Sequence, residues 1–249
     1  MSDEELAKDP GPLAALTIGV GTMIGAGVFV LPEDAITGAG SFAVLSFLSG
    51  GGIALLTALS ASELGTAMPR SGGAYFYVNR ALGPLFGSIA GWTNWLGLAF
   101  ASAFYMVGVG QYVARTFAVQ GRVGVGALSL SYVQIVALAG AALFVGVNYV
   151  GAKETGRLQN VIVAILAVFA IVGALQADLG NLPAGEGYGP ILTTTGLIFV
   201  SYLGLVQITS VAEEIKDPDR NLPRAVIGSA LIVTVIYALV LFVMSAAVE

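Results

Sequence analysis

Two apolar segments of the sequence are interrupted by glycine or small polar residues, and a ligand could be held at these points. The first segment, residues 18–32, carries Gly19, Gly21, Gly25 and Gly27. Each glycine weakens a helix by about 1 kcal/mol relative to alanine. A helix that breaks here leaves backbone N–H and C=O groups free to bind the charged ends of a small molecule. The alternative is a close helix-packing face of the Gly-x-x-x-Gly type.

The second interrupted segment, residues 196–210, places Ser201, Tyr202, Gly204 and Gln207 near the middle of an otherwise apolar run. Polar groups at that depth in a membrane need partners, and lining a cavity would supply them. Hydrogen bonding between helices is the alternative. Four other apolar segments separate the two interrupted ones, which is the spacing of a five-helix unit repeated with inverted topology. The pattern favours a transporter.

The overall composition excludes several other kinds of chemistry. The chain has no histidine and no cysteine, which removes thiol chemistry, His-dependent catalytic triads and the usual zinc ligands, so we expect no cofactor and no metal. Only 10% of its 249 residues are charged and 57% are hydrophobic, whereas a soluble domain is about a quarter charged. A net charge of −5 speaks against a nucleic-acid partner. The composition predicts an integral protein of the lipid bilayer.

The charged residues leave seven long charge-free runs, and each predicts one membrane-spanning helix. The runs are residues 10–32, 35–62, 81–114, 123–152, 158–177, 187–212 and 225–248. With the N-terminus placed in the cytoplasm, eight of the ten Lys and Arg residues fall in inner segments. The positive-inside rule therefore predicts a multi-pass protein of the cell membrane with a cytoplasmic N-terminus.

Glu63 is the one acidic residue that is not obviously in a loop, because it directly follows run 35–62 at the cytoplasmic end of the second predicted span. Ionisable groups within membranes face protein or water and are often functional. We expect the Glu63 side chain to do so, and proton handling is one hypothesis for it beside a purely structural role.

Three stretches act together as a signature. Residues 25–32 read Gly-Ala-Gly-Val-Phe-Val-Leu-Pro, residues 69–75 read Pro-Arg-Ser-Gly-Gly-Ala-Tyr, and Gly91-Trp92 follows at the entry to the third span. Residues 213–224 form a charged loop with two prolines that ends in Pro-Arg. As a set, from about residue 13 to the C-terminus, the sequence resembles the amino acid–polyamine–organocation (APC) family of amino-acid permeases.

The resemblance implies an all-α membrane protein with the LeuT-like inverted-repeat transporter fold, incomplete at about seven transmembrane helices. Residues 1–11 would form a cytoplasmic tail, and residues 12–177 the first five-helix repeat. Residues 178–249 would begin the second, inverted repeat with spans six and seven, its remainder being absent. Members of the family usually have about twelve spans, so the sequence is similar to an N-terminal portion of one.

The resemblance also implies a substrate site at mid-membrane between broken helices 1 and 6. In the family, backbone N–H groups at the first break bind the substrate carboxylate, and carbonyls beside both breaks receive its ammonium group. Tyr202 matches an aromatic residue that often gates the site. The implied substrate-binding residues are Thr22, Met23, Gly25, Ala26, Gly27, Ser201, Tyr202 and Gly204.

Two features bear on the substrate and on coupling. No charged side chain lies at mid-depth in any of the seven predicted spans, which favours a neutral amino acid over a cationic one as the substrate. Some family members carry a lysine in span five that is linked to proton coupling, whereas this chain has Leu166 near that position. The partner of secondary-active transport, a coupling ion (proton or sodium) or a counter-substrate, stays open.

Other seven-span functions meet specific obstacles. A retinal protein needs a lysine in its last span for the Schiff base, and residues 225–248 have none. An intramembrane aspartyl protease needs two aspartates within spans, yet every aspartate here flanks them. We therefore expect no enzyme. A truncated, non-transporting permease that serves as a membrane scaffold or subunit remains the alternative.

Overall fold

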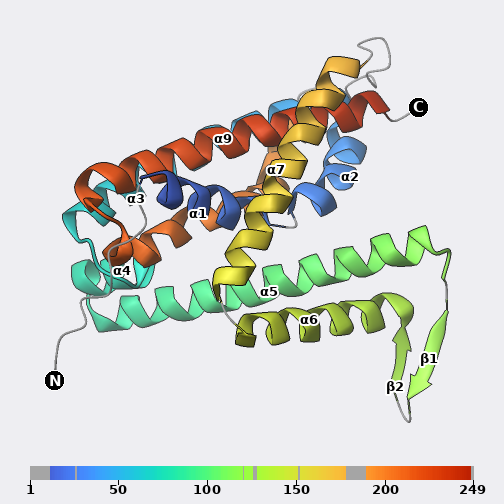
Figure 1. Ribbon diagram of the computed structural model, residues 1–249, viewed down its shortest axis with the longest axis horizontal. Helices are drawn as coiled ribbons and strands as arrows, with labels where there is room; N and C mark the ends of the chain where they lie inside the picture. Colours follow the sequence, from blue (N-terminus) through green and yellow to red (C-terminus); the bar gives the residue numbers. More distant parts are fainter. Residues whose placement is uncertain are drawn as a thin grey trace. The chain divides into compact units, whose positions relative to one another are not determined.

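The computed structural model describes residues 12–25, 27–119, 121–125, 128–150, 152–177 and 189–247, and this part of the chain is mostly α-helical (Figure 1). Its elements, with η for a 3₁₀-helix, are α1 (Pro12–Ile24), α2 (Gly27–Ala39), η1 (Gly40–Phe42), α3 (Ala43–Ala67), α4 (Gly73–Leu82), α5 (Pro84–Thr116), β1 (Arg122–Val125), β2 (Leu128–Ser131), α6 (Tyr132–Val150), α7 (Ala152–Gln176), α8 (Gly189–Ile198), η3 (Phe199–Glu214) and α9 (Pro218–Ala247). The predicted tail, residues 1–11, lies outside the described residues.

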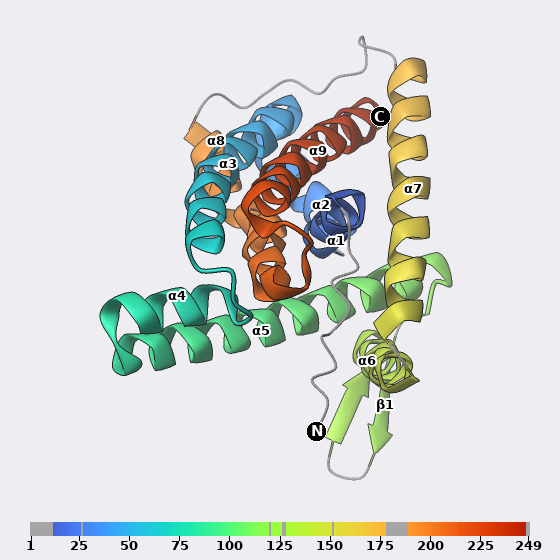
Figure 2. The ribbon, with the colours of Figure 1, turned by 60° about the vertical axis from the view of Figure 1, so that its left-hand side comes forward.

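The chain divides into two compact units, one of residues 1–91 and 159–249 and the other of residues 92–158. In the first unit α9 packs against α1, α3 and η3 (Figure 2). The face that α9 buries carries Val226, Ala230, Val233, Tyr237 and Leu241. Their spacing of three and four residues is that of one side of an α-helix, so the apolar pattern itself turns this side toward the core.

Small residues bring α3 close to α9 and to the sixth predicted span, which consists of α8 and η3. A Cβ atom added at Gly51 would lie 2.5 Å from the Thr234 hydroxyl oxygen of α9, and one added at Gly50 would lie 3.4 Å from the Tyr202 ring. Because lipid tails are as apolar as leucine, membrane helices associate through this kind of close packing. The glycines of α3 therefore position the elements that carry the candidate site.

The second unit contains most of α5, the β1–β2 hairpin and α6. A Cβ added at Gly110 of α5 would lie 3.1 Å from a methyl group of Val133, and one at Gly140 of α6 would lie 3.4 Å from the Met106 sulfur. At the start of α6 the Ser131 hydroxyl accepts the Gln134 N–H at 3.3 Å, while the Gln134 side chain accepts the Ser131 N–H at 2.9 Å. This reciprocal pair is a capping box, which satisfies N–H groups that the first helical turn cannot.

Each of the seven charge-free runs contains a helix. Five described spans are long and apolar enough to cross a membrane: Ala43–Ala67, Pro84–Thr116, Tyr132–Tyr149, Gly189–Glu214 and Pro218–Ala246. The bent pair α1–α2 would add one more span to these five. The apolar stretch of α7, Asn160–Gln176, is shorter. The protein is thus a multi-pass membrane protein with five or six such spans among its described residues.

The predicted boundaries are wrong in two places. The first span does not end before the charges at Glu33 and Asp34, because α2 continues through both exposed residues to Ala39. The run 123–152 is not helical throughout, because it begins within an antiparallel hairpin in which Arg122 pairs with Ser131 and Val125 with Leu128. Valine and leucine alternate there with glycine and serine, a period of two that is typical of strands.

Candidate functional site

The first span is broken where its glycines cluster. Helix α1 ends at Ile24, α2 begins at Gly27, and the two are bent by 46°. Gly25 lies at the break with an exposed position, whereas Gly27 is buried. Ala26 lies outside the described residues. The C-terminal end of α1 and the N-terminal end of α2 thus meet within the span, and these ends carry partial negative and positive charge respectively.

The sixth span, Gly189–Glu214, changes its helical type within the interrupted segment at residues 196–210. It is an α-helix from Gly189 to Ile198 and a 3₁₀-helix from Phe199 to Glu214, with non-helical backbone angles at Val211. Runs of 3₁₀-helix longer than three or four residues are uncommon because their hydrogen bonds have poorer geometry. Ser201, Tyr202 and Gly204 lie in its first two turns.

The two irregular segments touch each other through their backbones. A Cβ atom at Gly204 would lie 2.7 Å from the Met23 nitrogen and closer still to the carbonyl of Thr22. Only glycine allows such an approach. The Thr22 hydroxyl donates to the Gly19 carbonyl at 3.0 Å and lies 3.3 Å from the Gly204 carbonyl. We call the meeting point of residues 22–23 with residues 201–204 the junction.

Tyr237 of α9 ties the two sides of the junction together, and the sequence analysis missed it. Its hydroxyl lies 2.9 Å from the Met23 carbonyl and 3.3 Å from the Ser201 carbonyl, and the side chain is fully buried. A hydroxyl has one proton, so it donates fully to only one of the two carbonyls at a time. The available signal was a tyrosine within an apolar run, since a buried tyrosine hydroxyl needs a partner.

Aromatic rings fill the space behind the junction. Phe47 and Tyr202 both meet the Tyr237 ring edge to face, with centroids 5.5 and 5.4 Å away. The Tyr202 hydroxyl donates to the Phe47 carbonyl at 3.0 Å. Tyr202 is 1% exposed, so it packs inside the bundle, and its role as a gate stays a prediction.

The remaining predicted residues are placed as follows. Met23 and Ser201 are buried at the junction. Leu166 of α7 is buried in the core of the first unit. Glu63 lies near the end of α3 with an exposed side chain. No group of three or more His, Cys, Asp or Glu residues suited to a metal ion occurs in the described ranges.

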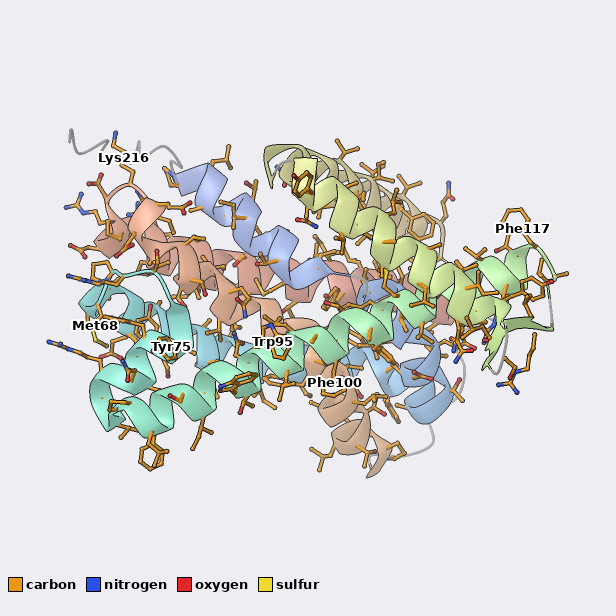
Figure 3. The ribbon with its side chains drawn as sticks, turned by 90° about the horizontal axis from the view of Figure 1, so that it is seen from below. Met68, Tyr75, Trp95, Phe100, Phe117 and Lys216 are labelled. Atoms are coloured by element: carbon orange, nitrogen blue, oxygen red, sulfur yellow. The ribbon has the colours of Figure 1, made fainter. Side chains whose placement is uncertain are left out.

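The stretch at residues 69–75 forms the turn that starts α4. Gly72 and Gly73 adopt positive φ angles of 119° and 52°, which favour glycine. A Cβ at Gly73 would lie 2.7 Å from the Ser210 hydroxyl oxygen, so this turn lies directly against η3. Tyr75 of α4 (Figure 3) lies against α5, since a Cβ at Gly91 would be 3.0 Å from its ring. Burial raises the pKa of Tyr77, the next tyrosine on α4.

Comparison with known proteins identifies relatives along nearly the whole chain. Residues 11–249 match the amino acid permease family. An uncharacterized transporter of Mycobacterium tuberculosis is 32% identical over 95% of this chain and 52% of its own length. The serine/threonine exchanger SteT of Bacillus subtilis is 31% identical over 96% of this chain and 55% of its own. The branched-chain amino acid permease BcaP of the same organism is 28% identical over 98% and 56%.

The chain spans about half the length of these curated relatives. Their names are those of transporters and permeases rather than enzymes, in agreement with the multi-pass helical structure. The resemblance seen in three separate stretches therefore extends over almost all of the sequence, and the chain belongs to the amino acid permease family.

Proposed function

We propose that the protein takes part in secondary-active transport of amino acids across the cell membrane, with its N-terminus in the cytoplasm. The substrate binds at mid-membrane, at the junction between the broken first and sixth spans. The observation that carries this proposal is the backbone contact of Gly204 with Thr22 and Met23. It brings the end of α1 and the 3₁₀-helical part of the sixth span into direct contact.

The broken first span is electrostatically suited to a zwitterion. The N-terminal end of α2 offers N–H groups and partial positive charge, so the substrate carboxylate binds at Gly25, Ala26 and Gly27. The C-terminal end of α1 offers carbonyls and partial negative charge, so the ammonium group binds near Thr22 and Met23. The opposing carbonyls come from η3, around residues 201–204. Tyr237 positions the two sets of carbonyls.

The fold belonging to this proposal is the LeuT-like inverted repeat. The seven spans would be α1–α2, α3, α5, α6, α7, α8–η3 and α9. Residues 12–177 form the first five-helix repeat and residues 178–249 begin the second. This assignment is supported by the two interrupted spans, which stand five apart in that order.

A neutral amino acid is the proposed substrate. The side chains around the junction are aromatic, aliphatic or hydroxyl-bearing, and none of Phe47, Tyr202 and Tyr237 carries a charge. A cationic or anionic side chain would lose its water here without an opposite charge to replace it. Two relatives support the same class by name, one for serine and threonine and one for branched-chain amino acids.

Equilibrium binding of radiolabelled alanine to the purified chain tests this function, with unlabelled lysine and glutamate as competitors. We expect saturable alanine binding that neither charged amino acid displaces. Absence of saturable binding would contradict the proposal and favour a non-transporting scaffold or subunit.

The coupling partner is a proton, sodium or a counter-substrate, and Glu63 is the candidate proton-handling residue. Its side chain is exposed and lies near the end of α3, at the edge of a predicted span. If it does so, Glu63→Gln will flatten the pH dependence of amino-acid uptake in vesicles. An unchanged pH profile would remove this role.

A further inference from the structure

The hydroxyl of Ser201 is the exception among the side-chain hydroxyls at the junction. The hydroxyls of Thr22, Tyr202 and Tyr237 each pair with a backbone carbonyl. The Ser201 hydroxyl, on a side chain that is 2% exposed, has no hydrogen-bond partner among the described residues. A buried hydroxyl without a partner destabilises the folded protein, and native proteins retain few of them.

The position of Ser201 distinguishes it from the two other unpartnered hydroxyls in the described ranges, Tyr77 and Ser245. Tyr77 belongs to α4, and Ser245 lies in the last turn of α9. Ser201 lies at the junction itself, because its own carbonyl is 3.3 Å from the Tyr237 hydroxyl that also reaches Met23. The unpartnered hydroxyl therefore belongs to a residue whose backbone forms part of the proposed binding site.

Other groups of the proposed site are suited to bind the charged ends of an amino acid. Backbone carbonyls of Met23 and Ser201 suit an ammonium group, and the N-terminal end of α2 suits a carboxylate. A serine hydroxyl both donates and accepts, which matches another hydroxyl group. The neighbouring aromatic rings distinguish a hydroxyl from a methyl group only weakly. One net hydrogen bond from a group in the site adds about fivefold to that distinction.

We propose that the Ser201 hydroxyl determines substrate specificity by hydrogen-bonding the side-chain hydroxyl of a small hydroxy amino acid, of the class of serine and threonine. This inference rests on the proposed function and sharpens it. An aliphatic substrate of the same size leaves the Ser201 hydroxyl unpaired and binds more weakly.

Serine and alanine are matched probes, because they differ only by the hydroxyl group. We would measure the Kd of each for the parent chain, for Ser201→Ala, and for the control Ser245→Ala, which removes another buried unpartnered hydroxyl. In the parent, serine should bind more tightly than alanine. Ser201→Ala should weaken serine binding about fivefold, the effect of one net hydrogen bond, and leave alanine binding unchanged. Ser245→Ala should alter neither.

Three results would overturn the inference. Equal weakening of serine and alanine would assign the hydroxyl to a group that all amino acids share. Unchanged serine binding in Ser201→Ala would show that the hydroxyl takes no part in binding. The same conclusion would follow if the parent bound alanine more tightly than serine. Absence of saturable binding of both ligands to the parent would instead overturn the proposed function. Thermal unfolding checks that both variants remain folded. We expect this result, because neither substitution removes a hydrogen bond among the described residues.

Discussion

The spans around the junction and the spans of the second unit differ in how deeply they are buried. In an 18-residue apolar stretch of α9, 50% of the residues are buried. The buried share of the corresponding stretch is 44% in the sixth span, Gly189–Glu214, and 6% in α6. Both groups contain polar and small residues, but only the first fixes them by packing on several sides. Residues of the same type should therefore respond very differently to substitution in the two regions.

Glycine gives the largest expected contrast. Gly204→Ala places a Cβ against the backbone of Thr22 and Met23, which cannot move aside as a flexible side chain would. We expect destabilisation by about 1–3 kcal/mol, the usual range for overpacking, and complete loss of amino-acid binding. Gly146→Ala in α6 meets nothing within 4 Å and should raise stability slightly. Thermal unfolding and ligand binding of both variants would show this, and equal effects would refute the contrast.

Tyrosine provides the next contrast. Tyr237→Phe keeps the ring but removes the hydroxyl that reaches Met23 and Ser201, leaving a buried carbonyl without this donor. We expect amino-acid binding to weaken about tenfold, equivalent to about 1.4 kcal/mol. Tyr149 of α6 is 94% exposed, and Tyr149→Phe should change nothing measurable. Binding isotherms decide the matter, and an undiminished affinity in Tyr237→Phe would contradict the positioning role.

Threonine gives a smaller effect. The Thr22 hydroxyl donates to the Gly19 carbonyl within α1 and lies near the Gly204 carbonyl across the junction. Thr22→Val should therefore weaken amino-acid binding about fivefold. The Thr57 hydroxyl of α3 donates to the Ile53 carbonyl of its own helix, and Thr57→Val is the matched control. Equal affinities for these two variants would mean that the junction does not depend on the Thr22 hydroxyl.

The smallest effect on amino-acid binding is expected in the second unit. Ser131→Ala removes the capping box at the start of α6 and should lower stability by about 1 kcal/mol, the usual value of an N-cap. Amino-acid binding should be unchanged, because the second unit supplies none of the proposed ligands. A fall in affinity without a fall in stability would connect this unit to the site.

The parts of the fold that depend on local composition were predictable. Each long helix among the described residues overlaps a charge-free run, and the break before Gly27 falls where four glycines occur within nine residues. The strands β1 and β2 have a sequence signal, the alternation of Val or Leu with Gly or Ser. This stretch was predicted to be helical because most of it lies in a long charge-free run. The charges at Glu33 and Asp34 did not end α2, because both side chains are exposed and the helix continues without burying them.

The role of Tyr237 could not be predicted, because it depends on contacts far apart in the chain. Residues 23, 201 and 237 come together only when three helices pack. The same holds for Ser201, whose lack of a partner is a property of the assembled junction. Residue type indicated a polar group in an apolar span, but only the packed structure shows which polar groups pair with one another.

The most direct test of substrate binding at the junction is saturable binding of radiolabelled alanine to the parent chain, Gly204→Ala and Gly146→Ala, measured side by side. We predict saturable binding by the parent and by Gly146→Ala, and none by Gly204→Ala at a temperature where all three are folded. Equal binding by all three proteins would contradict a site at the junction.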